Sequence, residues 1–293
     1  MPLEATKLHP LFAAAIAGVD LACAVDDATL AEIVALMDRY AVCAYHHPGR
    51  PLSDEEHIAF SRQLGPIQRS VVLTVSGKSE TRIRHPEIID QSNLDEYGAL
   101  YPEAGRYLLF KRANRLWHTD MSFHPVRATY SLLNAHALPP GGGPDTEFAD
   151  LRAAYDALPE AMKTRIDDLV AEHSYWHSRV MGGGPEPTAE ELQSRPPALH
   201  RLVQVHPGSH RKTLYLASHA RSIVGMGLDE GRALLQELTA HATQERFVYA
   251  HKWRVGDVVI WDNLCTMHRA MPFDDLKHIR DVRRTTCREA AVA

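Results

Sequence analysis

The chain has 293 residues, a formal net charge of −5, and 45% hydrophobic and 24% charged residues. This balance is typical of a soluble globular protein with one large domain or two small ones. The negative charge argues against general binding to nucleic acids or anionic membranes, and no run of about 18 apolar residues predicts a membrane span.

The N-terminal stretch LFAAAIAGVDLACA has the apolar character of a signal-peptide core. Its flanks do not fit, because Glu4 is acidic, Lys7 is the only early cation, and Asp20 interrupts the apolar run. We therefore expect a cytoplasmic protein. The four cysteines are far apart and form no CxxC pair, so we expect reduced and mostly buried thiols at Cys23, Cys43, Cys265 and Cys287.

The first 65 residues predict a strand, a helix, a strand and a second helix. Apolar residues recur at helical spacing within 26–40, and Asp26 or Asp27 is suited to cap that helix. Residues 40–47 predict a short buried strand. Ser53 and Glu56 have the spacing of a capping box, so a helix is expected over 53–65.

The remainder of the chain alternates between irregular and regular segments. Residues 66–113 carry mixed charge and predict loops that form a lid over a substrate. We expect strands at 130–138, 212–218, 246–253 and 258–263, and helices at 150–159, 159–173 and 229–243, with a short helix capped by Thr188 and Glu191. Repeats and flexible linkers are absent from the sequence, which favours one domain over 1–293 with a β-rich core and surface helices.

The segment LWHTDMSFHP places His118 and Asp120 two residues apart. On a strand these side chains share a face and could hold one metal ion, whereas on a helix they would diverge. The pattern alone is weak, because eighteen histidines produce a His-x-Asp triplet by chance about once. A rival pair, His85 and Glu87, flanks a proline and is expected in a loop.

A third candidate ligand is His268, which follows a predicted buried strand and a turn in VVIWDNLCTMHRA. Two histidines and one carboxylate make the facial triad of non-haem Fe(II) oxygenases. On these residues alone, a hydrogen-bonded histidine of the core is an equally good interpretation of His268. The glycine run at 141–143 is not followed by Gly-Lys-Ser/Thr, so a turn is expected there rather than a phosphate-binding loop.

Taken in order, several motifs give the chain a resemblance to the taurine/2,4-dichlorophenoxyacetate dioxygenase family. These motifs are VCAYHHPGRPLSDEEHIAFSRQLGPI, LWHTDMSF, GGGPDTEFADLRAAYDALP, GDVVIWDNLCTMHRA and IRDVRRTT. The resemblance covers nearly the whole chain, and the ordered set is highly specific. The segments LHPLFAA, DLRAAYDALP and HATQERFVYAHKWRVGD are most similar to the phenoxyacetate-cleaving branch.

The resemblance implies a mixed α/β fold around a double-stranded β-helix, a cupin-like jelly roll. It implies that His118, Asp120 and His268 hold Fe(II), that Thr146 and Arg280 bind 2-oxoglutarate, and that Arg284 and Asn114 lie beside the substrate. His206 and His219 resemble substrate-side histidines of the phenoxyacetate branch. An extra Pro144 and one extra residue between His268 and Arg280 depart from the family pattern, so Arg283 remains an alternative to Arg284.

Coordination chemistry independently supports this assignment of roles. Three protein ligands leave three coordination positions for a chelating 2-oxo acid and O2. The second carboxylate of 2-oxoglutarate then needs a fixed cation, and a guanidinium matches carboxylate geometry. On a strand, Arg280 and Arg284 would share a face about 13 Å apart, enough to serve two anions, while Arg283 would face the other way.

We therefore expect an Fe(II)- and 2-oxoglutarate-dependent dioxygenase that hydroxylates a small anionic substrate. An aryloxyalkanoate such as 2,4-dichlorophenoxyacetate would be cleaved to a phenol and glyoxylate, with succinate and CO2 from the co-substrate. The alternatives are the same chemistry on taurine, an alkyl sulfate or another small acid, and a jelly-roll metal-binding or sensing module without turnover. A zinc hydrolase is disfavoured because HExxH is absent. The expected partners are the small substrate and further copies of the chain in a homo-oligomer, without nucleic acid or membrane.

Overall fold

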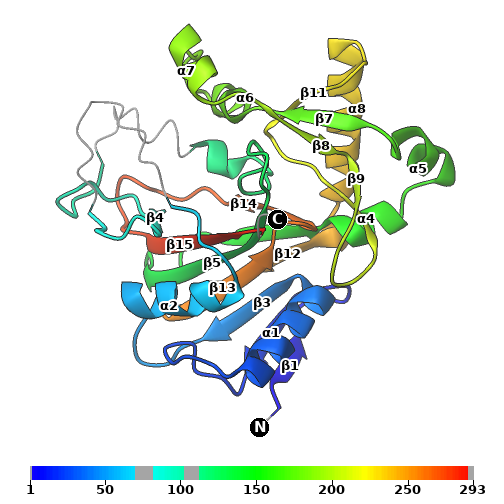
Figure 1. Cartoon of the computed structure of the whole chain (residues 1–293). Coiled ribbons are helices and arrows are strands. Elements are labelled where there is room, and N and C mark those ends of the chain that lie inside the picture. The colour runs from blue at the N-terminus through cyan, green and yellow to red at the C-terminus, as the bar shows by residue number, and fades with distance from the viewer. Residues whose placement is uncertain (1, 70–81, 102–111, 290–293) are drawn as a thin grey trace.

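The computed structural model describes residues 2–69, 82–101 and 112–289. Its N-terminal part follows the predicted pattern except that two strands, not one, precede the first helix. The elements are β1 (Glu4–Lys7), β2 (Ala14–Ala17), α1 (Asp27–Tyr40), β3 (Val42–His46) and α2 (Asp54–Leu64). Asp26 caps α1 by accepting a hydrogen bond from the Thr29 N–H, and Ser53 and Glu56 form the predicted capping box of α2. Both helices lie against one face of the larger sheet (Figure 1).

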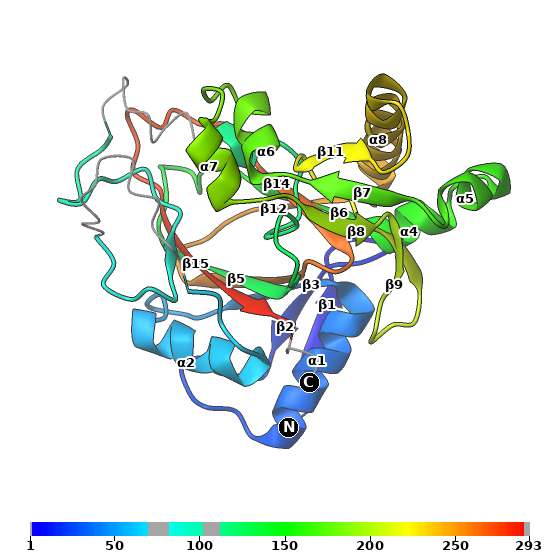
Figure 2. The same cartoon turned by 45° about the horizontal axis from the view of Figure 1, so that its top comes forward.

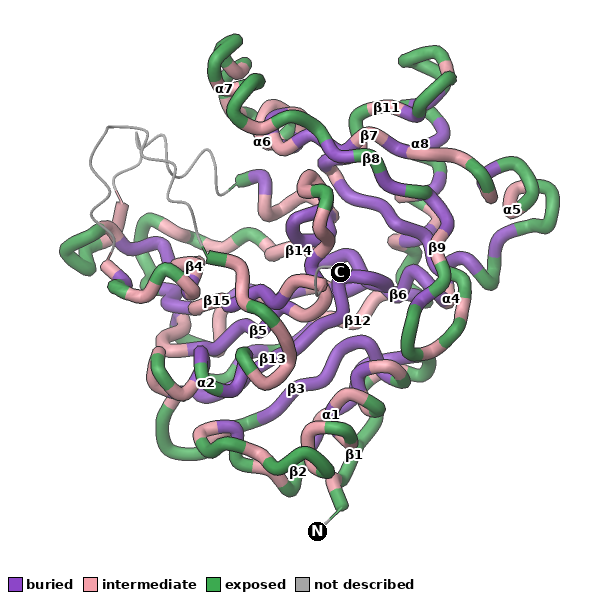
Figure 3. The backbone as a smooth tube through the Cα atoms, viewed as in Figure 1, coloured by how far each residue is buried: buried purple, intermediate pink, exposed green. Residues whose placement is uncertain are grey.

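The larger sheet has seven strands in the order β1-β2-β3-β13-β5-β15-β4. Its later members are β4 (Ile89–Asp90), β5 (Ala128–Ala137), β13 (Asp257–Asp262) and β15 (Asp281–Arg288). The central strand β13 pairs antiparallel with β3 on one side and with β5 on the other. All six residues of β13 are buried, as expected for a strand covered on both faces (Figure 3).

A smaller sheet faces the larger one and contains β12 (Val248–His251), β6 (Thr146–Asp150) and β14 (Thr266–Ala270) in that order. Phe148 of β6 packs on Trp261 of β13 with ring centroids 5.5 Å apart, and both side chains are almost completely buried. This apolar layer, with Val259, Leu133 and Val282, joins the two sheets. Apart from the parallel pair β2–β3, the strands of both sheets run antiparallel, and two facing sheets of this kind are the arrangement of a jelly roll.

Residues 151–247 connect β6 to β12 and carry most of the surface helices (Figure 2). Their elements are α4 (Leu151–Asp156), α5 (Glu160–Ile166), β7 (Val170–His173), α6 (Tyr175–Met181), α7 (Ala189–Ser194), β8 (Ala198–Arg201), β9 (Val203–Val205), β10 (Lys212–Leu214), β11 (Ala220–Ile223), α8 (Leu228–Ala242) and the 3-10 helix η2 (Glu245–Phe247). Residues Leu234, Leu235 and Leu238 of α8 pack into a second core with Leu151 and Ala154 of α4.

Some element predictions were wrong in part, and the strand expected over 212–218 spans only Lys212–Leu214 as β10. The helix expected over 159–173 ends at Ile166, and 170–173 forms β7, because this segment pairs with β8 and β11 and buries Ala171 and His173 at alternate positions. The strand expected over 246–253 begins only at Val248, after η2. In both places the element boundary is set by pairing with distant segments, which the local sequence pattern does not reveal.

The segment 66–113, expected to form loops, has little regular structure where it is described. It contains the two-residue strand β4, which pairs with β15 at Arg283 and Arg284, and isolated bridges at Ile67 and between Leu94 and Leu100. The parts of the expected lid at 70–81 and 102–111 lie outside the described residues. Among the described helices, none is long and apolar enough to cross a membrane.

Candidate active site

The 3-10 helix η1 (Ala113–Arg115) leads into His118, which forms an isolated antiparallel bridge with His268 of β14. The His118 N–H donates to the His268 carbonyl over 3.0 Å, and the His268 N–H donates to the His118 carbonyl over 2.8 Å. This reciprocal pair joins the two histidine-bearing segments. Met121 then adopts a positive φ of 55°, so the chain turns sharply directly after Asp120.

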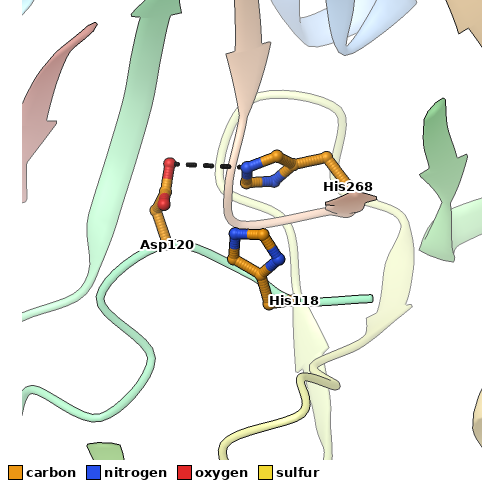
Figure 4. A group of neighbouring side chains, drawn as sticks. All are labelled: His118, Asp120 and His268. Atoms are coloured by element: carbon orange, nitrogen blue, oxygen red, sulfur yellow. Dashed lines mark ion pairs between the residues drawn. The ribbon is translucent and has the colours of Figure 1, made fainter. Parts of the chain in front are cut away.

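The side chains of His118, Asp120 and His268 converge between the two sheets (Figure 4). Their potential ligand atoms all lie within 4.8 Å of one another, and all three residues are buried. Nε2 of His268 is 3.9 Å from Oδ2 of Asp120, and the two imidazole centroids are 4.2 Å apart. Nδ1 of His118 donates to the Leu116 carbonyl over 2.8 Å, which leaves its Nε2 lone pair free to bind a metal.

Three groups from other parts of the fold hold Asp120 in place, two at its carboxylate and one at its backbone. The Ser131 hydroxyl donates to Oδ2 over 2.7 Å, and the Arg284 guanidinium donates to Oδ1. The Asp120 N–H donates to the side-chain oxygen of Asn263 over 3.2 Å. Both strands of the larger sheet that face the site, β5 and β15, therefore contribute to the orientation of one ligand.

The electrostatics of this cluster suit a divalent cation. Burial lowers the pKa of His118 and lowers that of His268 well below its ordinary value, so both rings are neutral at physiological pH. Burial by itself would raise the pKa of Asp120, but the Arg284 charge and the two histidines bring it below its usual value. Two neutral imidazoles and one carboxylate are the donor set of a facial Fe(II) site, so these residues fit that metal.

A second buried group of potential ligands, His206, Asp262 and Cys265, is less suited to a metal. His206 uses both ring nitrogens, because Nε2 donates to Asp262 Oδ2 over 2.8 Å and Nδ1 accepts from the Ser209 N–H over 3.0 Å. Burial raises the pKa of Cys265 well above its ordinary value, so it is a neutral thiol. His206 therefore links β13 to the turn after β9, and the substrate-side position expected for it stays a prediction.

Arg280 directly precedes β15 and is buried, with 7% of its surface exposed. No carboxylate among the described residues pairs with its guanidinium, and Nε has no hydrogen-bond partner there. Burial without a counter-ion lowers its pKa to about 10. A buried and uncompensated guanidinium is what a site for a carboxylate ligand requires.

Thr146 is the first residue of β6 and follows a turn in which Gly141, Gly142 and Gly143 all have positive φ. This agrees with the predicted turn, since glycine adopts such angles without steric cost. The buried Thr146 hydroxyl accepts a hydrogen bond from Trp253 Nε1 over 3.0 Å. Because its oxygen is the acceptor, the Thr146 hydroxyl proton can be donated to an anion.

The alternation along β15 separates the two candidate substrate arginines. Arg283 points toward α2, where it pairs with Asp54 over 2.8 Å, and it also pairs with Asp281 over 3.2 Å. Arg284 points toward the metal-binding cluster and pairs with Asp120. Of the two, only Arg284 thus faces the metal-binding cluster, and its place beside the substrate stays a prediction.

His219 and Asn114 border the same region. The His219 ring lies edge-on to His118 with centroids 6.2 Å apart, and its Nδ1 is 3.0 Å from the Ser122 hydroxyl. The Asn114 amide donates to the Gln91 side chain over 3.0 Å, and the Gln91 N–H donates to the Val282 carbonyl of β15. Asn114 is thereby tied to the strand that carries Arg284.

Several residues that shape the site were not predicted from the sequence. Ser131 donates to the Asp120 carboxylate, Trp253 donates to the Thr146 hydroxyl, and Gln91 lies in a segment without periodicity. Asn263 was expected only as the last residue of the strand over 258–263, although its side chain also accepts from the Asp120 N–H. Its position after the last residue of the buried strand β13 was the one available signal, since polar residues at the end of a buried strand often belong to a site.

Comparison with known proteins agrees with this geometry. The family model for "Taurine catabolism dioxygenase TauD, TfdA family" matches residues 4–286. The chain is 40% identical, over the full length of both proteins, to alpha-ketoglutarate-dependent 2,4-dichlorophenoxyacetate dioxygenase from Cupriavidus pinatubonensis. It is 34% identical to (S)-phenoxypropionate/alpha-ketoglutarate-dioxygenase from Sphingobium herbicidovorans, with 93% of this chain and 89% of that protein covered.

A solved structure with a similar sequence identity to this chain supports the fold. The crystal structure of AAD-2 in complex with Mn(II) and N-oxalylglycine superposes with a TM-score of 0.93 and 41% sequence identity, covering 99% of each chain. The predicted sheet-rich α/β fold of the cupin type is thus confirmed.

Proposed function

The chain belongs to the TauD/TfdA dioxygenase family, and from this premise we propose that it cleaves aryloxyalkanoic acids. It is a 2-oxoglutarate-dependent dioxygenase, and its relatives imply Fe(II), 2-oxoglutarate and O2 as its requirements. Relatives named for 2,4-dichlorophenoxyacetate and (S)-phenoxypropionate support the proposed substrate class.

His118, Asp120 and His268 would hold the iron. When bound, Fe(II) supplies the oxidising chemistry, in which O2 and 2-oxoglutarate are consumed and succinate and CO2 are formed. The contribution of the chain is to keep this donor set rigid and dry. The Leu116 carbonyl orients one imidazole, while Ser131 and Arg284 orient the carboxylate.

Arg280 and Thr146 would bind the distal carboxylate of 2-oxoglutarate. The buried Arg280 guanidinium would gain the counter-ion that it lacks among the described side chains. The Thr146 hydroxyl would donate to the same carboxylate, because its oxygen already accepts from Trp253. Binding the co-substrate would thus compensate a charge whose burial is otherwise unfavourable.

Arg284 would anchor the carboxylate of the organic substrate. Its position beside Asp120, a proposed iron ligand, is the observation that carries this proposal. An aryloxyacetate held by its carboxylate at this point presents its neighbouring C–H bond to the metal, which is the positioning that the chemistry needs. His219, whose ring lies edge-on to His118, and Asn114, which is tied through Gln91 to β15, would also border the substrate.

The proposed reaction balances with one O2 and one 2-oxoglutarate. Hydroxylation of the carbon next to the ether oxygen converts the substrate to a hemiacetal. This hemiacetal collapses by breaking the C–O bond to the ring, and the phenol leaves with the hydroxyl proton. For phenoxyacetate the second product is glyoxylate, and one oxygen atom of O2 enters succinate.

The experiment is a substrate panel with succinate as the readout. Purified enzyme with Fe(II), 2-oxoglutarate and O2 should turn over 2,4-dichlorophenoxyacetate and release one phenol per succinate. Strong turnover of taurine or alkyl sulfates together with none of phenoxyacetates would overturn the proposal. A cytoplasmic homo-oligomer remains a prediction, and light scattering on the purified protein would test the oligomeric part of it.

A further inference from the structure

A buried asparagine outside the predicted site holds the backbone of Arg280. Asn93 has 4% of its surface exposed and lies in the segment 66–113 that was expected to form a lid. Its side-chain oxygen accepts from the Arg280 N–H over 2.8 Å, and its own N–H donates to the Arg280 carbonyl over 3.2 Å. Both backbone groups of Arg280 are therefore bonded to one residue.

The side-chain amide of Asn93 also holds the loop that leads to Arg280. Its Nδ2 donates to the Asp275 carbonyl over 2.7 Å and to the His278 carbonyl over 2.8 Å. The loop 271–279 contains neither helix nor strand, and each of its residues is exposed or half-buried. Such a loop has few packing contacts to fix its shape, so the amide of Asn93 supplies the donors that its inward carbonyls need.

The sheet does not fix Arg280 in the way that it fixes the residues after it. The pairing of β15 with β5 begins at Asp281, opposite Ala137, and its register shifts between Asp281 and Val282. Arg280 lies one residue before this start. The position of its backbone is therefore set by Asn93 rather than by β5.

Asn93 is itself held from both sides along the chain. Before it, β4 pairs with β15, and the Gln91 N–H donates to the Val282 carbonyl over 3.0 Å. After it, Leu94 forms an isolated bridge with Leu100. Asn93 thus stands at a fixed point of the fold, and its four hydrogen bonds transmit that position to Arg280 and its loop.

We propose that Asn93 is a positioning residue, which fixes the separation between the Arg280 guanidinium and the metal-binding cluster and so sets the length of the 2-oxo diacid that the enzyme accepts. This inference rests on the proposed role of Arg280 in binding the distal carboxylate of 2-oxoglutarate. The metal would hold one end of the co-substrate and Arg280 the other. When that separation is fixed, only one chain length brings both ends into contact, and a displacement of about 1 Å is costly.

The test measures the binding of three 2-oxo acids to the Mn(II)-loaded enzyme by anaerobic calorimetry, which is independent of turnover. 2-Oxoadipate is one methylene group longer than 2-oxoglutarate, and 2-oxopentanoate has the chelating end but no second carboxylate. The wild type should prefer 2-oxoglutarate over 2-oxoadipate by about tenfold or more.

Asn93→Ala should affect only the acids that reach Arg280. Its affinity for 2-oxoglutarate should fall about tenfold, and the preference over 2-oxoadipate should largely disappear. Binding of 2-oxopentanoate should be unchanged, because this acid has no group for Arg280 to bind. An unchanged affinity for Mn(II) verifies that the metal-binding cluster is intact.

Two further variants complete the experiment. Asn93→Ser removes less volume and retains one hydroxyl, so it should fold and give affinities between those of the wild type and of Asn93→Ala. Ser92→Ala is the matched control, because Ser92 is the buried neighbour and its hydroxyl accepts from the Leu94 N–H of its own segment over 3.2 Å. It should leave all three affinities unchanged.

Equal weakening of all three acids in the Asn93 variants would show a general disturbance of the site and overturn the positioning role. So would a wild-type preference for 2-oxoglutarate that both variants retain in full. The proposed function fails separately, if the Asn93 variants behave as expected but phenoxyacetates are not turned over by the wild type.

Discussion

Replacing Arg280 by Met should have opposite effects on the protein alone and on its co-substrate complex. The guanidinium is buried and lacks an acidic partner among the described side chains. Its pKa of about 10 corresponds to a penalty of about 3 kcal/mol for the buried charge, at 1.36 kcal/mol per pKa unit. Arg280→Met removes this penalty. In the absence of 2-oxoglutarate, the free energy of unfolding of the variant should therefore exceed that of the wild type by part of this amount.

The same substitution removes the cation that would bind 2-oxoglutarate. A lost charge-assisted contact of about 3 kcal/mol weakens binding roughly a hundredfold. The midpoint of thermal unfolding should therefore be higher in the Arg280→Met variant than in the wild type. Added 2-oxoglutarate with Mn(II) should no longer raise the midpoint of the variant. The KM for 2-oxoglutarate should increase by about the same hundredfold factor.

Arg283→Met is the matched control on the opposite face of β15. Its guanidinium is paired with Asp54 and Asp281, so the substitution leaves two carboxylates without their partner. It should lower the unfolding midpoint and leave the KM for 2-oxoglutarate nearly unchanged. If Arg280→Met destabilised the protein alone, or left the KM unchanged, the assignment of Arg280 would be refuted.

Three further predictions test the supporting contacts. Ser131→Ala removes the hydrogen bond to Asp120 Oδ2 and should weaken Mn(II) binding about tenfold in an anaerobic titration, and an unchanged affinity would contradict the role of Ser131. Trp253→Phe removes the donor to Thr146 and should raise the KM for 2-oxoglutarate about fivefold without changing metal affinity, as expected for a loss of about 1 kcal/mol. Burial lowers the pKa of His57 to about 3, so below about pH 6.5 the unfolded chain binds a proton that the folded chain does not, and this residue should cost about 1.4 kcal/mol of stability per pH unit of acidification down to about pH 3. In urea unfolding at several pH values, His57→Gln should reduce the slope of stability against pH by that amount, and an unaltered slope would show that His57 is protonated in the folded state.

The sequence predicted those parts of the fold that local chemistry determines. The capping residues of α1, α2 and α7 and the turn at Gly141–Gly143 agree with their patterns. The wrong helix boundary at 167–173 arose because the partners of β7 lie on β8 and β11, and local periodicity contains no information about them.

For the site, the sequence supplied candidates but not their geometry. His118 and Asp120 were expected on a strand or at its end, yet only His118 makes a bridge, and a turn with Met121 at positive φ follows Asp120. The choice between Arg283 and Arg284 depended on the register of β15 against β5. His206 matched by position alone, and only its two hydrogen bonds revealed a structural role.

The most direct test of the central claim is anomalous diffraction at the iron edge from crystals grown anaerobically with Fe(II). We expect one strong peak per chain, bound by Nε2 of His118, Nε2 of His268 and the Asp120 carboxylate. An iron peak at the other buried cluster, formed by His206, Asp262 and Cys265, with none beside Asp120, would contradict the proposed active site.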